Sequence, residues 1–253
     1  MVTELKYSAT NTYLIQGRKG LLLFDTGWAG TFPRFCRALG EAGCCLQDIR
    51  YILISHYHPD HMGIAQEIAS HGPVIAAADV QKAYIHQSDH IFQKEHNRFF
   101  IPVKDEDLRI VPLAESRNFL GELGIDGEII HTPGHSEDSI SLLLDDGCVF
   151  VGDLNPLYEL ELHAGTQIEA SWRRLLAADP RTICYGHANT AHPELYTLIE
   201  KIIRYTDRGL SLQQIRKKTG AGELFVEDVV RMYLTHRDVG VQGILDRIEI
   251  KGR

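Results

Sequence analysis

Short runs of apolar residues, bounded by glycine, proline or charged residues, recur along the first 190 residues of the chain. Runs of this length and composition are typical of β-strands. The first two surround a Gly-Arg-Lys-Gly turn at 17–20, and the third, at 51–54, is apolar throughout, as expected of a buried strand. The strands predicted in this way are residues 11–15, 20–24, 51–54, 73–77, 128–130, 140–144, 148–151 and 182–185.

Helical periodicity separates these runs and takes over near the end of the chain. Phe35 and Leu39 lie four positions apart, on one face of a predicted helix. Thr166 and Glu169 form a capping-box pattern that opens another helix, which stops before Pro180. The helices predicted are residues 31–42, 63–70, 80–100, 166–179 and, from 193 onward, a series that includes 212–218 and 226–234.

Strands and helices thus alternate over residues 1–192, whereas residues 193–253 are helical throughout. Residues 200–253 hold 11 Lys and Arg against 8 Asp and Glu, a net charge of +3 within a total of -8. The pattern predicts a mixed domain followed by a small helical appendage. Its glycine turn at 219–222 fits a helix-turn-helix or winged-helix-like module, but a lid packed on the main core is the commoner arrangement.

The composition fits one large domain with such an appendage: 253 residues, 44% hydrophobic and 24% charged. An acidic surface repels phosphate backbones, so nucleic acid is a disfavoured partner. There are five cysteines, an odd number without a Cys-x-x-Cys pair, which is typical of a reducing compartment. The N-terminus shows no apolar signal region and no apolar run reaches 18 residues. We therefore expect a cytoplasmic protein without a membrane span.

Side chains that can bind a metal ion are most concentrated directly after the buried strand 51–54. His56, His58, Asp60 and His61 fall within six positions, and Gly63 follows. On an extended backbone His56 and His58 point the same way. One ion cannot easily take all four groups from so tight a turn, whereas two neighbouring ions can, with two groups on each. Imidazole and carboxylate ligands suit zinc, and also iron or manganese.

Three further ligand-type residues each follow a predicted strand. His135, Asp153 and His187 all stand directly after a glycine, which permits close backbone approach. This repeated order of strand, glycine and ligand is what a site at one edge of a sheet requires. The sequence therefore predicts a site for two divalent metal ions.

This motif set resembles that of the metallo-β-lactamase-fold hydrolase superfamily over about residues 8–190. His56, His58, Asp60 and His61 match its H-x-H-x-D-H signature, and Asp25 matches its early strand-end aspartate. The resemblance implies a four-layer αββα sandwich with the metals at one edge. It also implies ligand sets, namely His56, His58 and His135 on one metal, Asp60, His61 and His187 on the other, with Asp153 bridging and Asp25 orienting the ligand loop by hydrogen bonds.

The implied activity is hydrolysis of a carbonyl substrate. Two cations make hydroxide available from a shared water near neutral pH, and Asp60 is a secondary candidate for proton transfer. A thiolate leaving group needs little further acid, and esters and lactones react at the same kind of carbonyl carbon. We therefore expect a thioester, ester or lactone, in the manner of the glyoxalase II and lactonase branches. Asp153 stands where one major subclass of true β-lactamases uses cysteine, which argues against β-lactamase activity.

Substrate contacts are less firmly marked. Tyr158, five positions after Asp153, is similar in place to a lactonase tyrosine, and Asn189 follows His187 where the glutathione-binding pattern of glyoxalase II is not found. Phe92 belongs to an aromatic segment, 80–100, that could line a partly apolar pocket. The predicted partner is accordingly a small acyl molecule that is partly apolar, with a homodimer left open.

Three other functions share parts of the motif. A mononuclear iron persulfide dioxygenase has the same early histidines but binds one iron. A phosphodiesterase or nuclease would use the +3 tail on nucleic acid, and a sensor would use the fold without catalysis. The intact set of seven ligand positions favours the dinuclear hydrolase over these alternatives.

Overall fold

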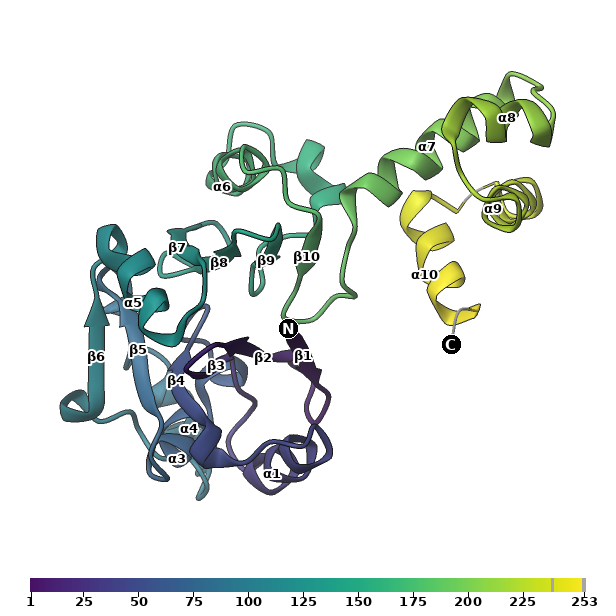
Figure 1. Ribbon diagram of the computed structural model, residues 1–253. Coiled ribbons are helices and arrows are strands. Elements are labelled where there is room, and N and C mark those ends of the chain that lie inside the picture. Colours follow the sequence, from purple (N-terminus) through teal and green to yellow (C-terminus); the bar gives the residue numbers. More distant parts are fainter. Residues whose placement is uncertain (238, 252–253) are drawn as a thin grey trace. The chain divides into compact units, whose positions relative to one another are not determined.

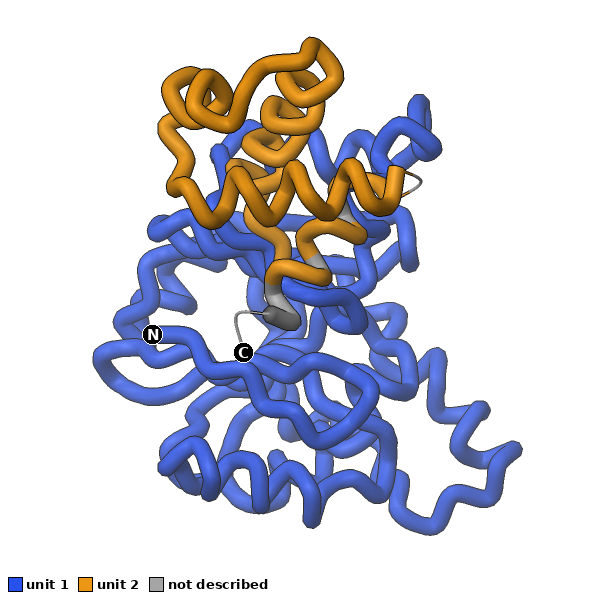
Figure 2. The backbone as a smooth tube through the Cα atoms, turned by 90° about the vertical axis from the view of Figure 1, so that its right-hand side faces the viewer, with its two compact units in different colours: residues 1–190 blue, residues 191–253 orange. Residues whose placement is uncertain are grey.

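The computed structural model describes residues 1–237 and 239–251. The chain folds into two compact units, residues 1–190 and residues 191–253 (Figure 2). The division lies two residues before the boundary expected from the sequence.

The first unit contains two β-sheets (Figure 1). The larger has six strands in chain order, and only its first three are antiparallel; β3 to β6 run parallel. Parallel strands are covered on both faces and therefore need apolar residues on both. The strands are β1 Val2–Leu5, β2 Thr12–Gly17, β3 Gly20–Phe24, β4 Ile49–Leu53, β5 Val74–Ala78 and β6 Leu108–Val111.

The smaller sheet has the order β10-β9-β8-β7. Its strands are β7 Gly127–His131, β8 Ile140–Leu144, β9 Cys148–Phe150 and β10 Thr182–Cys184. β8 is antiparallel to β7 and β9, and β10 is parallel to β9. Hence β7, β9 and β10 run in the same direction, and the segments that follow them leave the sheet at one edge.

One hydrophobic core lies between the two sheets and another outside the larger one. Tyr13 and Ile15 of β2 face the first core, together with Leu142 and Phe150 of the smaller sheet. Leu14, between them in sequence, faces the second. This alternation is the two-residue period of a strand, and it assigns one face of the larger sheet to the other sheet and the opposite face to helices.

Helices cover the outer faces and complete the αββα sandwich that the family resemblance implied (Figure 1). α1 (Phe32–Glu41) packs through Phe35 and Leu39, and α3 (Ala65–Ala69) through Ile68, into the outer core of the larger sheet. α6 (Gln167–Leu176) buries Trp172 and places its ring 6.4 Å from that of Tyr185, just after β10. The remaining helices of this unit are α2 Pro59–Met62, α4 Asp89–Lys94 and α5 Ser116–Leu123, with short 3-10 turns at 46–48, 79–81, 105–107, 113–115 and 157–163.

The least accurate prediction concerned residues 79–123. The helix expected over 80–100 is limited to a 3-10 turn at 79–81 and the six residues of α4. His96, just after α4, has a φ of 51°, outside the helical region. β6 and α5 were not predicted, nor was β1 at the N-terminus. β1 and β6 are four-residue strands at the two edges of the larger sheet, where half of each strand is solvated and the apolar pattern is weak.

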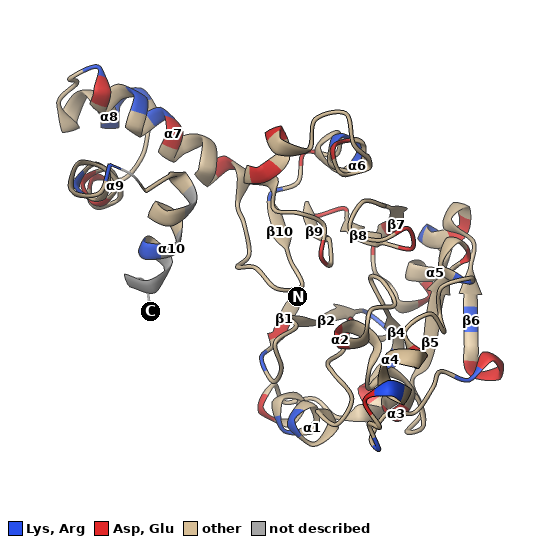
Figure 3. Ribbon diagram, turned by 180° about the vertical axis from the view of Figure 1, so that it is seen from behind, with Lys and Arg blue, Asp and Glu red and all other residues tan. Residues whose placement is uncertain are grey.

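The second unit is a bundle of four helices among its described residues: α7 Pro193–Asp207, α8 Leu212–Thr219, α9 Glu223–Thr235 and α10 Val241–Lys251. Ile199, Ile215, Val226 and Ile244, one from each helix, share its hydrophobic core. Only residues 220–222 separate α8 from α9, and Gly220 ends α8 with a φ of 71°. α8 carries Arg216, Lys217 and Lys218 in its last turn and no Asp or Glu, whereas α7 carries residues of both charges (Figure 3). In the described part of the chain, no helix has the length and apolar character needed to cross a membrane.

Candidate metal centre

The seven ligand-type side chains reach one place from four segments. His56 and His58 lie in the loop after β4, and Asp60 and His61 lie in α2, which Pro59 begins. His135, Asp153 and His187 follow β7, β9 and β10, whose ends lie at the same edge of the smaller sheet. The structure therefore brings together residues that are up to 131 positions apart in sequence.

Three histidines form one half of the cluster. The ligand nitrogens of His56, His58 and His135 all lie within 4.8 Å of one another. His58 Nδ1 and His135 Nε2 are 3.1 Å apart. Two nitrogens bound to one tetrahedral zinc at about 2.0 to 2.1 Å stand about 3.3 Å apart, so this pair has nearly the spacing of two ligands of one ion.

Asp60, His61 and His187 form the other half, again with ligand atoms within 4.8 Å of one another. Asp60 Oδ2 lies 2.9 Å from His187 Nε2 and 3.8 Å from His61 Nε2. Two imidazoles and one carboxylate are a common zinc set.

Asp153 lies between the two halves. Its Oδ2 is 3.8 Å from His56 Nε2, 3.6 Å from His135 Nε2 and 3.4 Å from His187 Nε2. Its other oxygen, Oδ1, lies 3.2 Å from His61 Nε2. One carboxylate thus faces nitrogens from both halves, which is the position that a bridging ligand occupies.

The innermost atoms of the cluster lack partners of suitable geometry. Among the described residues, His56 Nε2, His61 Nε2 and Asp153 Oδ1 are buried and make no well-formed hydrogen bond, although the last two are only 3.2 Å apart. Buried polar atoms are nearly always satisfied. Atoms that point at a common centre and lack partners fit a site for cations, so the residues present fit two metal ions.

Asp25 and Ser55 orient two of the imidazoles. Asp25 Oδ2 accepts a hydrogen bond from His61 Nδ1 at 2.9 Å and from Ser55 Oγ at 2.8 Å, and Asp25 Oδ1 accepts the Ser55 N–H at 2.7 Å. The Ser55 hydroxyl has a single proton, which it donates to Asp25, so it accepts from His56 Nδ1 at 3.0 Å. Both rings therefore carry their proton on Nδ1 and direct Nε2 into the cluster.

His187 is oriented in the same way by the main chain. Its Nδ1 lies 3.0 Å from the carbonyl oxygen of Ala9, to which it donates. The role of Ser55 was not predicted, although its place beside His56 was an available signal. Ala9 contributes only a carbonyl group, for which a sequence contains no signal. The predicted contact of Asp25 with the ligand loop is present, and Asp25 holds an unusual φ of 61° to make it.

The electrostatics divide the cluster into neutral and charged groups. Burial lowers the pKa of His56 well below its ordinary value, and His61 lowers it further. Burial also acts to lower the pKa of His61, but Asp25 and Asp153 outweigh it and raise the pKa to about 10. Asp153 and Asp60 raise the pKa of His187 to about 10. A cation on either of these two rings would therefore take the place of a proton.

The two carboxylates are correspondingly ionised. Burial alone would raise the pKa of Asp153, but His187 and His61 lower it well below its usual range. The pKa of Asp60 is lowered in the same way by His187. Without metal, the protonated rings of His61 and His187 offset part of this negative charge. Divalent cations bound to the neutral imidazoles would offset it in their place.

Exposure falls from one side of the cluster to the other. The His56 and His61 side chains are at most 1% exposed, whereas those of Asp60, His135 and His187 are 32%, 30% and 40% exposed. The open side of the cluster therefore includes ligands of both halves, and a small molecule can reach the centre from there.

Glycines permit the close packing behind the ligands, as the sequence pattern predicted. A Cβ on Gly152, which has a φ of 55°, would lie 2.5 Å from Ser55 Oγ. A Cβ on Gly186 would lie 2.4 Å from Asp153 Oδ1. The side chains of Ser55 and Asp153 could not keep their positions if Gly152 and Gly186 were replaced by larger residues.

The three predicted substrate contacts lie in different surroundings. Tyr158 is 48% exposed in the 3-10 turn 157–163, and Asn189 is exposed two residues after His187. Phe92 is 1% exposed, and its ring stacks on Phe100 at 3.9 Å and packs against Trp28 at 5.2 Å. Phe92 therefore exposes almost no surface to a substrate in this arrangement, because its ring packs in the hydrophobic core.

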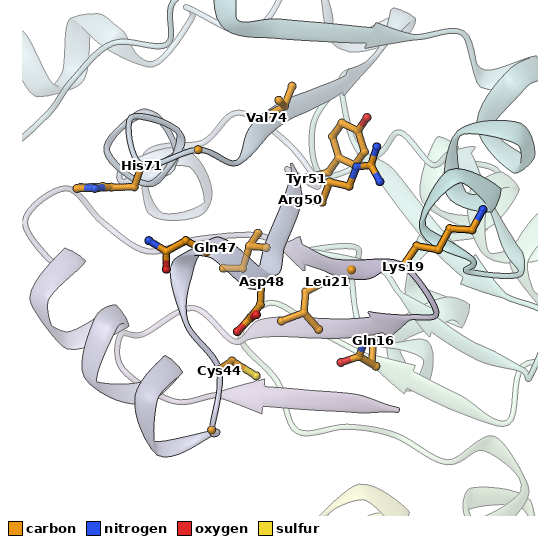
Figure 4. A pocket seen from close by; sticks show the side chains of 14 residues that line it. Gln16, Lys19, Leu21, Cys44, Gln47, Asp48, Arg50, Tyr51, His71 and Val74 are labelled. Carbon is orange, nitrogen blue, oxygen red and sulfur yellow. The ribbon is translucent and has the colours of Figure 1, made fainter.

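A hollow of about 890 Å³ lies at the other edge of the larger sheet (Figure 4). Leu21, Ile49 and Val74, at the starts of β3, β4 and β5, line it, together with Lys19 and Arg50. The ligand-bearing loop follows the opposite end of β4, so this hollow is separate from the candidate metal centre.

The fold and this cluster agree with comparisons to known proteins. Residues 6–187 match the family model of the Metallo-beta-lactamase superfamily, and the chain belongs to that family. A Drosophila melanogaster protein, the Beta-lactamase-like protein 2 homolog, is 29% identical over 198 residues, which cover 74% of this chain and 61% of the relative. The Atrochrysone carboxyl ACP thioesterase of Aspergillus fumigatus is 27% identical over 153 residues, covering 59% of this chain and 30% of the relative.

Solved structures match at lower identity. TTHA1623 in a di-iron-bound form has a TM-score of 0.58 at 20% identity, with 78% of this chain and 96% of that one covered. A metallo-beta-lactamase family protein from Thermus thermophilus has a TM-score of 0.56 at 17% identity, with 94% and 93% covered. These likenesses show a shared fold. The chain spans between about half and two thirds of the length of the first two curated relatives it matches.

Proposed function

We propose that this protein is a dinuclear metal-dependent hydrolase that cleaves an acyl substrate, namely a thioester, ester or lactone. The observation that supports it most is the arrangement of two three-residue ligand groups around the single carboxylate of Asp153, with unpartnered buried atoms at their common centre.

Within this proposal His56, His58 and His135 would hold one ion, Asp60, His61 and His187 would hold the other, and Asp153 would contact both. Bound there, two divalent cations would lower the pKa of a water molecule and polarise the carbonyl group of a substrate. Zinc suits the nitrogen and oxygen donors best, and iron or manganese would also be accommodated.

The chain's own residues supply orientation and charge. Asp25 and Ser55 keep the protons of His61 and His56 on Nδ1, so that both Nε2 atoms stay available. Asp60 lies on the open side of the cluster with its pKa lowered, and its carboxylate is the candidate to receive a proton there. The thiolate that leaves a thioester would need no further acid from the protein, whereas the alkoxide that leaves an ester or a lactone would take up one proton. Thioesters therefore demand the least of these residues.

The relatives support the thioester class within this range. One of them is named as an acyl carrier protein thioesterase, and the name applies to that protein. The candidate substrate contacts left in the proposal are Tyr158 and Asn189, both exposed.

Elemental analysis of the purified protein, followed by a panel of thioesters, lactones and phosphodiesters, tests the proposal. We expect about two ions per chain and turnover of an acyl substrate. His58→Ala should lower that turnover by about 100-fold or more, as for a displaced reacting group, while His90→Ala, an exposed histidine outside the cluster, should leave it unchanged. Protein that binds no metal would refute the proposal, and a single iron with oxygen uptake on a persulfide would support the dioxygenase instead.

A further inference from the structure

Tyr57 separates the two ligands His56 and His58, and both of its main-chain polar groups are bonded to distant side chains. Its N–H donates to Asp138 Oδ2 at 2.7 Å, and its carbonyl accepts from Ser88 Oγ at 2.6 Å. These two bonds fix the peptide planes on either side of Tyr57. Because those planes set the directions of the neighbouring residues, they also set where the His56 and His58 rings point.

Asp138 belongs to the segment that carries the third histidine. It lies three residues after His135, in the loop between β7 and β8. Its carboxylate therefore joins the two segments whose imidazoles make up one half of the cluster. The 3.1 Å separation of His58 Nδ1 and His135 Nε2 spans this same junction.

Gln81 reinforces the junction from the main-chain side. Its Nε2 lies 3.2 Å from the carbonyl oxygen of Asp138, 2.9 Å from that of Ile54 and 3.2 Å from that of Ser55. Gln81 is itself fixed, since its Oε1 accepts the N–H of Ala78 at 3.0 Å. Gln81 thus fixes the main chain of Asp138, while the Asp138 side chain fixes the ligand loop through Tyr57.

The junction between the Tyr57 and Asp138 segments is buried, and not all of its polar atoms have hydrogen-bond partners. Asp138 and Tyr57 are both 0% exposed, and among the described residues Asp138 Oδ1 has no hydrogen-bond partner. A buried carboxyl group with one free oxygen costs stability, so the contribution of Asp138 to folding alone is a poor explanation for its presence. Its effect on the spacing of the three imidazoles is a better one.

We propose that Asp138 is a positioning residue, which holds the His56–Tyr57–His58 segment in register with His135 and so sets the affinity of that half of the centre for its metal ion. This inference rests on the proposed function, because it assumes that the three histidines bind an ion.

The test compares metal binding by four variants with that of the full-length protein. Asp138→Ala removes the acceptor of the Tyr57 N–H, and Asp138→Asn keeps an oxygen in its place. Ser88→Ala removes the bond to the Tyr57 carbonyl. Ser141→Ala is the control, because it removes a buried 2.7 Å hydrogen bond to Thr132, at the start of the same loop, without touching Tyr57. Zinc affinities are measured by competition with a chelator, and cobalt-substituted protein reports the geometry of each ion by its visible spectrum.

We expect Asp138→Ala to weaken one of the two ions by about 10- to 100-fold, the usual effect of losing a group that orients a ligand. The cobalt spectrum of that ion should change while that of the other is retained. Asp138→Asn should restore the affinity to near the original value, and Ser141→Ala should bind both ions as the original protein does.

Three results would overturn the inference: unchanged affinity for both ions in Asp138→Ala, an equal loss in Ser141→Ala, or no rescue by Asp138→Asn. If Asp138→Ala does not fold, Ser88→Ala decides, since it should weaken the same ion and the inference fails if it does not. Original protein that binds no metal at all would refute the proposed function itself, which is a separate outcome.

Discussion

Replacing Gly186 by alanine adds a single methyl group directly behind the bridging carboxylate. The new Cβ would lie 2.4 Å from Asp153 Oδ1 and 2.8 Å from His61 Cε1, whereas ordinary contacts begin at 3.4 Å. Gly186 does not hold a positive φ, so the effect is steric rather than conformational. The carboxylate would have to move by about 1 Å, and metal–ligand distances tolerate only about 0.2 Å.

We therefore expect Gly186→Ala to lose at least one of two bound ions and to lower hydrolysis by about 100-fold or more. The overpacking should also destabilise the fold by about 1 to 3 kcal/mol. The assay is elemental analysis of the purified variant, with urea unfolding for stability and the acyl substrate panel for activity.

Gly121→Ala is the matched control. Gly121 lies within α5, and apart from its chain neighbours and the backbone of that helix no atom lies within 4 Å of the position its Cβ would take. An alanine there should stabilise the helix by about 0.5 to 1 kcal/mol and leave the metal content unchanged. Two tightly bound ions in Gly186→Ala would refute the reasoning, because the position of Asp153 would then not matter to the centre.

Three further predictions follow from the same geometry. Asp25→Ala should lower metal affinity by about 10- to 100-fold, because His61 and Ser55 lose their hydrogen-bond acceptor. Asp126→Asn, at an exposed position, should leave the affinity unchanged. Chelator competition measures both variants, and an Asp25→Ala affinity equal to that of the original protein would contradict the role given to Asp25. A chelator should lower the melting temperature of the protein, and added zinc should restore it. An ion whose free concentration is 100 times its Kd stabilises the folded state by about 2.7 kcal/mol. A melting temperature that does not change with zinc would argue against bound metal. The pKa of His61 is raised to about 10, so in metal-free protein its stabilising contribution is complete below about pH 6.5 and disappears as the pH rises through 10. Urea unfolding of the metal-free protein at pH 6.5 and 9.5 should show lower stability at the higher pH, and the opposite trend would contradict the charged His61–Asp25 pair.

Some features were readable from the sequence because they are local. His56, His58, Asp60 and His61 fall within six consecutive positions after a buried strand, so their proximity needs no tertiary contact. A glycine next to each later ligand predicted close backbone approach, and the spacings at Gly152 and Gly186 agree. The family follows from these motifs taken together, and the family model matches the chain over 6–187.

Other features were decided by tertiary structure alone. The strand pattern did not place β7, β9 and β10 in one direction, and only that arrangement brings His135, Asp153 and His187 to the same edge. An aromatic residue such as Phe92 suits a pocket wall and a hydrophobic core equally well, and the sequence does not distinguish the two. The structure buries Phe92 in the core because Phe100 and Trp28 pack against it. Asp138 and the Ala9 carbonyl each act through a single hydrogen bond to a residue that is close only in the folded chain. Ser55 adjoins His56 in sequence, but its bonds to Asp25 also depend on the fold. A sequence specifies which groups can bind a metal, but the directions in which they point depend on long-range contacts, which form when the two sheets pack together.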